Sequence, residues 1–300
     1  MHDLIGDTHG HADALERLLR QLGYRRQKGV YRHPERQAIF LGDFIDRGPQ
    51  IRETLEIVRP MVDSGAALAV MGNHELNALA FHTAHPEKPG EHLRPHNEKN
   101  SHQHAETMRQ LPADELASYL AWFRSLPLWL ELNGLRVVHA CWDETRMAKI
   151  AGPITDEFLH SACLPGGHLF EPVEAILKGK EACLPPGATF CDKDGHERTA
   201  TRVKWYEPPA GHTYRTYAMA SEPIDSDEQL PGEVIQAAMP YPEDAEPVFV
   251  GHYWLKGPCP ELLRRNVACV DWSVAKGGFL CAYQWDGERE LDAGKFVWNT

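Results

Sequence analysis

The sequence contains no apolar stretch long enough to cross a membrane, which takes about 18 consecutive apolar residues. Its apolar runs have the length of strands, as in Ala66 to Met71. The first residues, Met1 to Gly6, also lack the basic start and the long apolar stretch of a secretory signal. We therefore expect a cytoplasmic protein with no membrane partner.

Paired cysteines are lacking as well. The chain has an odd number of cysteines and no Cys-x-x-Cys pair, the seven being Cys141, Cys163, Cys183, Cys191, Cys259, Cys269 and Cys281. This scatter predicts reduced thiols and excludes a disulfide framework or a zinc finger. Cys141 is interpreted as a small buried residue and not as a nucleophile, because no base is assigned to it.

Positive charge is scarce relative to negative charge. Lys and Arg number 31 against 43 Asp and Glu, which gives a net charge of −12. We expect no stable nucleic-acid binding, because that binding depends on clustered cations. A phosphorylated substrate remains compatible with the composition if metal ions supply the local positive charge. Histidine, by contrast, is abundant at 17 residues, and it is the commonest metal ligand.

Several catalytic motifs are also missing. The sequence has no Gly-x-x-x-x-Gly-Lys-Ser/Thr loop, no His-Glu-x-x-His and no Gly-x-Ser-x-Gly. ATP-driven enzymes, zinc proteases and serine hydrolases of those kinds are therefore excluded.

The first eighty residues alternate between strand and helix patterns. Strand-like runs end in Gly-Asp or Gly-Asn and are followed by helical stripes, in the order 3–6, 11–22, 37–41, 50–62, 66–71 and 75–81. This order predicts the α/β class with a largely parallel sheet. Because ligands bind at the carboxyl ends of such strands, a functional site is expected there.

The rest of the chain is less regular. A helix is predicted over 112–123, and strands over 126–132, 135–138, 248–250, 267–270 and 279–284. Residues 82–104 are interpreted as a solvated loop, because their histidines fit no ligand spacing. Residues 144–245 show weak periodicity and are interpreted as an irregular insertion within a single domain, 1–300. This insertion is a candidate substrate cap.

Four groups of polar residues follow the predicted strands. They are Gly6-Asp7-Thr8-His9-Gly10, Gly42-Asp43-Phe44-Ile45-Asp46-Arg47-Gly48, Gly72-Asn73-His74-Glu75, and the late histidines His139 and His252. Asp7 and His9 are one residue apart, so an extended backbone points both side chains the same way. Imidazole and carboxylate ligands without thiolate suit manganese, iron or zinc. The spacing therefore predicts a metal site.

These motifs, in this order, resemble the calcineurin-like metallophosphoesterases. Asp46-Arg47-Gly48 marks similarity to the phosphoprotein phosphatase family within them. The run 42–49 and the late pair Val270-Asp271 are similar to the bacterial branch that holds symmetrical diadenosine tetraphosphatases and small Ser/Thr-Tyr phosphatases. The resemblance implies an α/β/β/α four-layer sandwich with an insertion in the C-terminal half.

The resemblance also implies the residue roles. The first of two divalent ions would be held by Asp7, His9 and Asp43, with Asp43 bridging, and the second by Asn73, His139 and His252. Manganese is expected, with iron, zinc, nickel and magnesium as alternatives. The catalytic residues would be His74 as general acid, Asp46 as its orienting carboxylate and Arg47 as a phosphate clamp. Asn73 would also contact the substrate.

The substrate is left open between two enzymatic readings. One is a phosphatase acting on phosphomonoesters or phosphoproteins, and the other is a dinucleoside polyphosphate hydrolase such as a diadenosine tetraphosphatase. A third reading is a catalytically silent metal-binding regulatory protein. The segment Val70-Met71-Gly72 lacks the second phosphate-binding arginine of many eukaryotic-type members, for which Arg198 or Arg202 are candidate substitutes. Trp205 and Tyr206 are interpreted either as base-stacking or as core residues.

Overall fold

The computed structural model of the chain describes residues 1–185, 187–191, 197–219, 224, 226–232, 234 and 239–299. Its first third alternates as predicted, in the order β1 (His2–Ile5), α1 (Ala12–Gln21), β4 (Gln37–Phe40), α2 (Ile51–Asp63), β5 (Ala67–Ala69) and α3 (Asn73–His82). A polar hairpin of β2 (Arg25–Gln27) and β3 (Val30–Arg32) lies between α1 and β4 and was not predicted. Its first strand is exposed, so it carries no apolar signal.

The first sheet has the strand order β14-β15-β1-β4-β5, with β16 added beside β15. Its later strands are β14 (Asp271–Trp272), β15 (Phe279–Trp285) and β16 (Phe296–Trp298). Strands β1, β4 and β5 are parallel, as predicted, whereas β15 runs antiparallel to β1. The carboxyl ends of the three parallel strands therefore meet at one edge.

A second sheet packs against the first. Its order is β13-β12-β7-β6, with the bounds β6 (Trp129–Leu132), β7 (Leu135–Val138), β12 (Val248–Val250) and β13 (Val267–Cys269). Leu4 and Ile39 of the first sheet share one fully buried apolar cluster with Val137, Phe249 and Ala268 of the second. This layer holds the two sheets face to face, as the resemblance implies.

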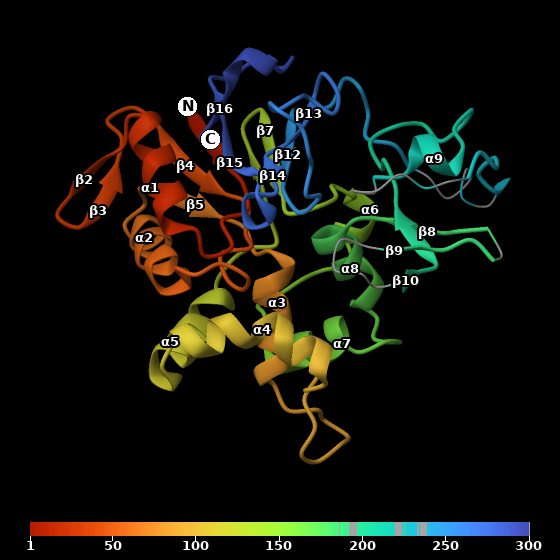
Figure 1. Cartoon of the computed structure of the whole chain (residues 1–300), viewed down its shortest axis with the longest axis horizontal. Helices are drawn as coiled ribbons and strands as arrows, with labels where there is room; N and C mark the ends of the chain where they lie inside the picture. The colour runs from red at the N-terminus through yellow and green to blue at the C-terminus, as the bar shows by residue number, and fades with distance from the viewer. Residues whose placement is uncertain are drawn as a thin grey trace.

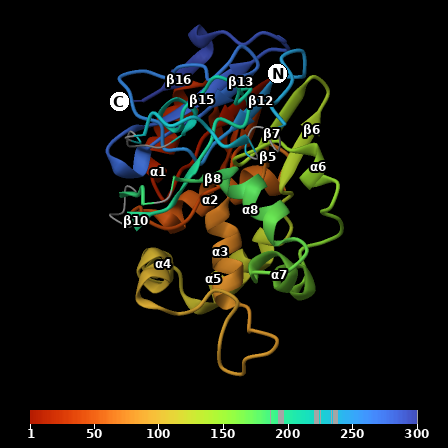
Figure 2. The ribbon, with the colours of Figure 1, turned by 90° about the vertical axis from the view of Figure 1, so that its right-hand side faces the viewer.

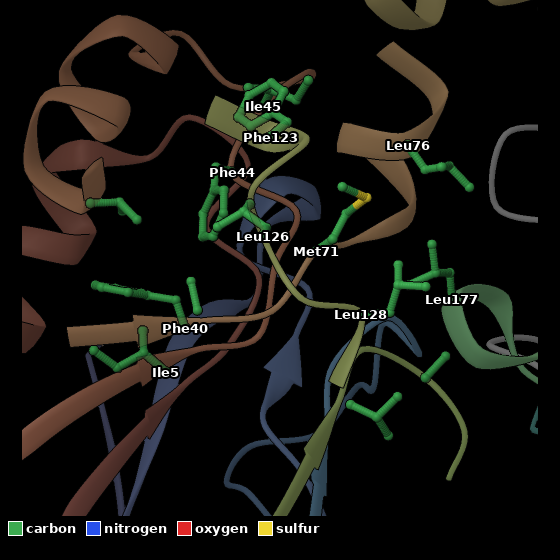
Figure 3. Close-up of a cluster of buried hydrophobic side chains, with 14 of the residues drawn as sticks. Ile5, Phe40, Phe44, Ile45, Met71, Leu76, Phe123, Leu126, Leu128 and Leu177 are labelled. Atoms are coloured by element: carbon green, nitrogen blue, oxygen red, sulfur yellow. The ribbon is translucent and has the colours of Figure 1, made fainter. Parts of the chain in front are cut away.

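Helices cover the outer face of the first sheet (Figure 1). The stripe of α1, which includes Leu15 and Leu18, shares a buried cluster with Ile5 and Phe40. Those two residues are paired on neighbouring strands and are drawn together in Figure 3. The view also shows Phe44, Met71 and Leu126 continuing this apolar layer past the strand ends.

The second sheet has a partly irregular cover. Val248 and Val250 share a cluster with Ile176 of α8 (Phe170–Lys178) and with Trp205 and Tyr206. Trp205 and Tyr206 are each 2% exposed, so they are core residues and the base-stacking interpretation is wrong. The described cover on this side includes helix α8 and aromatic residues of the insertion.

The remaining helices gather mostly at the end of the sheets where β5 ends, as Figures 1 and 2 show for α3, α4, α5 and α7. The helices not yet introduced are α4 (Glu98–Gln110), α5 (Ala113–Phe123), α6 (Glu144–Met147), α7 (Asp156–Cys163) and α9 (Tyr214–Tyr217). Helix α4 overlaps 82–104, so the prediction of a loop over that whole segment is wrong. Its buried face is polar and gives no apolar periodicity.

The described part of 144–245 is not featureless. It contains two short strand pairs, formed by β8 (Glu181–Cys183) with β11 (Ala200–Arg202) and by β9 (Phe190–Cys191) with β10 (Glu197–Arg198). It also has a small apolar cluster of its own, which includes Val203, Tyr214 and Tyr217. Its role as a cap and the single-domain division stay predictions.

All seven cysteines are free, and no helix of the described residues is long and apolar enough to cross a membrane.

Candidate metal centre

The predicted site residues converge at the edge where strands of both sheets end. Loops after β1 and β4 carry Asp7 and Asp43, and Asn73 is the first residue of α3, which follows β5. Strands β7 and β12 of the second sheet lead to His139 and His252. These five side chains are all buried. The two sheets thus bring together residues that lie up to 245 positions apart in the sequence.

Asp43 lies between two groups of possible metal ligands. In one group, ligand atoms of His9, Asp43 and His74 lie within 4.8 Å of one another, and in the other those of Asp43, His139 and His252 do. Asp43 Oδ2 is 3.5 Å from both His9 Nε2 and His139 Nε2. One carboxylate oxygen therefore faces both groups, which is the arrangement that a bridging ligand needs.

Asn73 belongs beside the second group. Its Oδ1 lies 3.2 Å from His139 Nε2 and 2.7 Å from His252 Nδ1. Asp7 falls outside both groups of mutually close atoms, although its Oδ2 accepts a hydrogen bond of 3.0 Å from the His252 backbone N–H. Its assignment to the first ion stays a prediction.

The backbone at the site is strained. Five non-glycine residues of the motifs have positive φ, namely His9 (39°), Asp43 (52°), Asp46 (64°), Arg47 (69°) and His252 (69°). Each residue held in the left-handed region costs about 1–3 kcal/mol and persists only where the surroundings enforce it. Such a concentration of strain is typical of a functional site.

Two glycines allow the backbone to approach the carboxylates. A Cβ on Gly72 would lie 2.2 Å from Asp43 Oδ1, and a Cβ on Gly251 would lie 2.1 Å from Asp7 Oδ1. Glu75 fixes the same loops, because it accepts backbone hydrogen bonds from Asp43 (2.8 Å), Phe44 (2.8 Å) and Gly72 (3.0 Å). Sequence reasoning gave Glu75 no role, although a Glu three residues after a helix N-cap is a recognisable capping signal.

Charge is balanced within the cluster by imidazoles. Burial opposes ionisation of Asp43, yet the imidazoles of His139, His74 and His9 hold its pKa well below the usual value. Burial would lower the pKa of His139, but Asp43 and Asp7 raise it to about 10. Burial and the neighbouring Asp271 raise the pKa of Asp7 well above its usual value. These shifts show that charged groups lie close together in the cluster, and a bound cation would change them.

The donor atoms fit divalent ions. His9 and His139 each donate from Nδ1 to a backbone carbonyl, at Ile45 and Leu41, which leaves Nε2 of each directed at Asp43. Among the described residues, Asp7 Oδ1 and His9 Nε2 are buried without a hydrogen-bond partner. Buried polar atoms of this kind are rare unless they serve a ligand. The residues present are thus able to hold metal.

His74 stands next to this cluster and is held by Asp46. His74 Nδ1 donates to Asp46 Oδ2 at 2.6 Å, which is the contact that an orienting carboxylate would make. The other oxygen, Oδ1, accepts from His104 Nδ1 at 2.8 Å and from Thr107 Oγ1 at 2.6 Å. Burial opposes ionisation of Asp46, but the hydrogen bonds from His104 and His74 hold its pKa below the usual value.

Comparison with known proteins identifies the family of this chain. The family model for calcineurin-like phosphoesterases matches residues 3–170, which is more than half of the chain. The chain belongs to the calcineurin-like phosphoesterase family. The predicted family is therefore confirmed.

Curated relatives of this chain include bis(5'-nucleosyl)-tetraphosphatases. It is 29% identical over 170 residues to the asymmetrical bis(5'-nucleosyl)-tetraphosphatase PrpE of Oceanobacillus iheyensis, covering 52% of this chain and 66% of the relative. It is 32% identical over 126 residues to the symmetrical bis(5'-nucleosyl)-tetraphosphatase of Psychromonas ingrahamii, covering 42% of this chain and 38% of the relative. Matches of this kind span 30% to 66% of the relatives' own length.

Solved structures share the fold of this chain. A protein serine/threonine phosphatase from Saccharomyces cerevisiae aligns with a TM-score of 0.53 at 14% identity, over 99% of this chain and 78% of that chain. A cold-active protein-tyrosine phosphatase of a Shewanella species aligns with a TM-score of 0.50 at 17% identity, over 94% and 75%. The calcineurin-like sandwich predicted from the resemblance is therefore confirmed.

His104 lies at the candidate site and was missed by sequence reasoning. It was placed in a solvated loop, but it is 4% exposed and lies on α4 against Asp46. Its Nε2 lies 3.2 Å from Nε2 of His82, at the end of α3. No sequence signal marked it, because the buried face of α4 consists of polar residues.

A cleft of about 560 Å³ opens over the metal-ligand cluster. Arg47 lines it, with its guanidinium 4.6 Å from the Trp254 ring. Arg198 and Arg202, the two cations suggested as phosphate contacts, line the same cleft.

Cys141 lies elsewhere in the core, and burial raises the pKa of its thiol to about 12. It is thus a packing residue, as predicted.

Proposed function

We propose that this chain hydrolyses phosphate esters with the aid of two divalent ions. The ligands would be Asp7, His9, Asp43, Asn73, His139 and His252. The observation that carries the proposal is the position of Asp43, whose Oδ2 faces both ligand groups at 3.5 Å beside the His74–Asp46 pair. When bound, the two ions would supply an activated water and neutralise charge on the phosphoryl group.

The chain's own residues would complete the reaction. Arg47 lines the cleft and offers a planar fork of N–H donors for phosphate oxygens. His74 would donate a proton from Nε2 to the leaving oxygen, a contribution of about 10²–10⁴-fold in rate. Asp46 would keep His74 in the right orientation through its Nδ1 proton.

The metal is proposed to be manganese, with iron, zinc, nickel and magnesium as alternatives. Mixed imidazole and oxygen ligands without thiolate support that choice. A cytoplasmic location is also proposed, and the seven free cysteines support it.

Hydrolysis of dinucleoside polyphosphates is the second candidate function. Cations that lie outside the metal-ligand cluster favour it, because Arg198 and Arg202 of the insertion face the same cleft. The names of the curated relatives, which are bis(5'-nucleosyl)-tetraphosphatases, point the same way.

The test compares p-nitrophenyl phosphate with diadenosine tetraphosphate after metal removal and reconstitution with each metal in turn. We expect metal-dependent hydrolysis, strongest with manganese, that Asp43→Asn abolishes and that His74→Asn lowers while metal stays bound. The ratio of the two substrates distinguishes the two candidate functions. Metal binding without turnover of either substrate would instead favour the silent regulatory protein.

A further inference from the structure

The cleft over the metal-ligand cluster is cationic in an acidic protein. The chain carries a net charge of −12, yet cations outnumber carboxylates among the described residues that line the cleft. The carboxylates are Asp43, Glu174 and Glu181, and the cations are Arg47, Arg94, Lys99, Lys178, Arg198 and Arg202. This excess exists before any metal is added, and a cleft lined by one sign of charge concentrates ligands of the opposite sign.

Arg94 stands out among these cations. Its Nη1 donates to Asn77 Oδ1 at 3.1 Å, and its Nη2 donates to Gln103 Oε1 at 2.7 Å, so both side-chain partners are neutral amides. Among the described residues, no carboxylate lies within ion-pair distance of it, and Asp46 and Glu174 act on its charge only from farther away. A partly buried guanidinium normally pairs with an anion, because desolvation of the charge is costly. The missing anion is therefore expected to come from a ligand.

The position of Arg94 relative to His74 shows which part of the ligand it would meet. Gln103 Oε1 accepts from Arg94, so the Gln103 amide nitrogen faces His74, 3.3 Å from Nε2. One amide side chain thus separates Arg94 from the atom that is proposed to protonate the leaving oxygen. Arg47, in contrast, stacks on Trp254, whose ring also contacts His9. The two arginines thus contact different residues of the cleft: Gln103, which faces His74, for Arg94, and Trp254 for Arg47.

We propose that Arg94 forms an anion subsite for a second phosphate group carried by the leaving portion of the substrate. This inference rests on the proposed function and deepens it. The substrate class would be phosphoanhydrides or esters whose leaving group is itself phosphorylated, and not monoesters of neutral alcohols. A cleft of about 560 Å³ is within the range of sites for nucleotide-sized ligands.

The first experiment measures binding without turnover. Metal-free protein is titrated calorimetrically with tripolyphosphate and, separately, with orthophosphate. Arg94→Gln is expected to weaken tripolyphosphate binding by about tenfold or more, since hydrogen bonds to charged groups are the strong ones, and to affect orthophosphate less. The matched control is Arg109→Gln on α4, whose cation is exposed and paired with Glu106. That variant is expected to bind as the wild type does.

The second experiment measures turnover of the metal-loaded protein. In Arg94→Gln, the ratio of kcat/KM for tripolyphosphate to that for p-nitrophenyl phosphate is expected to fall by about tenfold. Diadenosine tetraphosphate serves as a further arm. If kcat/KM for diadenosine tetraphosphate falls as much as that for tripolyphosphate, Arg94 binds a phosphate group. If kcat/KM falls only for the dinucleotide, Arg94 contacts the nucleoside and the assignment is overturned.

The stability of each Arg94 variant is monitored by thermal unfolding. The Arg94→Lys variant distinguishes loss of the positive charge from loss of side-chain packing. The lysine variant keeps the cation and is expected to recover most of the tripolyphosphate binding. If it binds as weakly as Arg94→Gln, or if Arg94→Gln binds tripolyphosphate like the wild type, the subsite is refuted. Absence of metal-dependent turnover in the wild type would contradict the proposed function alone, because the titration still decides the subsite.

Discussion

Replacing His104 by leucine removes one of the two side-chain hydrogen bonds that Asp46 Oδ1 accepts. The remaining one comes from Thr107 at 2.6 Å, while His74 stays on Oδ2 at 2.6 Å. Leucine fills a similar volume, so the main loss is the donor at 2.8 Å. His104→Asn restores a donor near the position of Nδ1 and is the conservative variant.

The expected size of the effect follows from that bond. A hydrogen bond to an ionised group contributes about 1.5–3 kcal/mol, which corresponds to roughly tenfold to a hundredfold in rate if all of it is felt in the transition state. The effect cannot exceed the whole contribution of the general acid, about 10²–10⁴-fold. It is also selective, because only a poor leaving group needs a proton. We therefore expect a fall of about tenfold for phenyl phosphate and less than about threefold for p-nitrophenyl phosphate.

The assay is kcat across a series of substituted phenyl phosphates in the wild type, His104→Leu and His104→Asn. The dependence of rate on leaving-group basicity should steepen in the leucine variant and return in the asparagine variant, with metal content unchanged. His102→Asn, an exposed residue of the same helix, is the matched control. An equal loss for all substrates, or no loss, would refute a positioning role for His104.

Three further changes test the site and the stability of its surroundings. Asp43→Asn is expected to reduce bound metal from two ions to at most one per chain, measured by elemental analysis, because Asp43 belongs to both ligand groups. Gly72→Ala places a Cβ 2.2 Å from Asp43 Oδ1 and should destabilise the protein by about 1–3 kcal/mol in urea unfolding, whereas Gly232→Ala, which meets open space, should not. Burial and nearby imidazoles lower the pKa of His82 from 6.5 to about 4. Between pH 6.5 and about pH 4 the folded state therefore binds fewer protons than the unfolded state. The free energy of unfolding should fall as the pH drops through this range, and it should fall less steeply in His82→Asn. A parallel pH dependence in both proteins would contradict the cause assigned to this shift.

The local sequence pattern was sufficient to predict the parallel strands of the first sheet and most of the proposed metal ligands. Strands β1, β4 and β5 are mostly buried and each contains a short apolar run, Leu4-Ile5, Ala38 to Phe40 and Ala67 to Ala69, that is followed by a polar motif. Parallel strands separated by helices place their carboxyl ends at one edge, which is why Asp7, Asp43 and Asn73 could be grouped before any coordinates. The order of the motifs then identified the family.

The second sheet could not be derived in this way. Strands β12 and β13 have three residues each, and β12 pairs with β7 from a distant part of the chain. Strand partners so far apart are chosen by the packing of the two faces, not by local sequence. The aromatic residues Trp205 and Tyr206 were ambiguous for the same reason, until burial against this sheet decided their role.

The sequence alone determined the class of fold, the strand-end motifs and the kind of chemistry they support, because apolar periodicity and motif order are local properties. Only the tertiary structure showed that His104 contacts Asp46 and that Arg94 lines the cleft over the metal-ligand cluster. Helix α4 packs against the site through a polar face, so its contacts with Asp46 and His74 have no periodic signal in the sequence. Polar residues become functional neighbours through three-dimensional packing, and that depends on the whole chain.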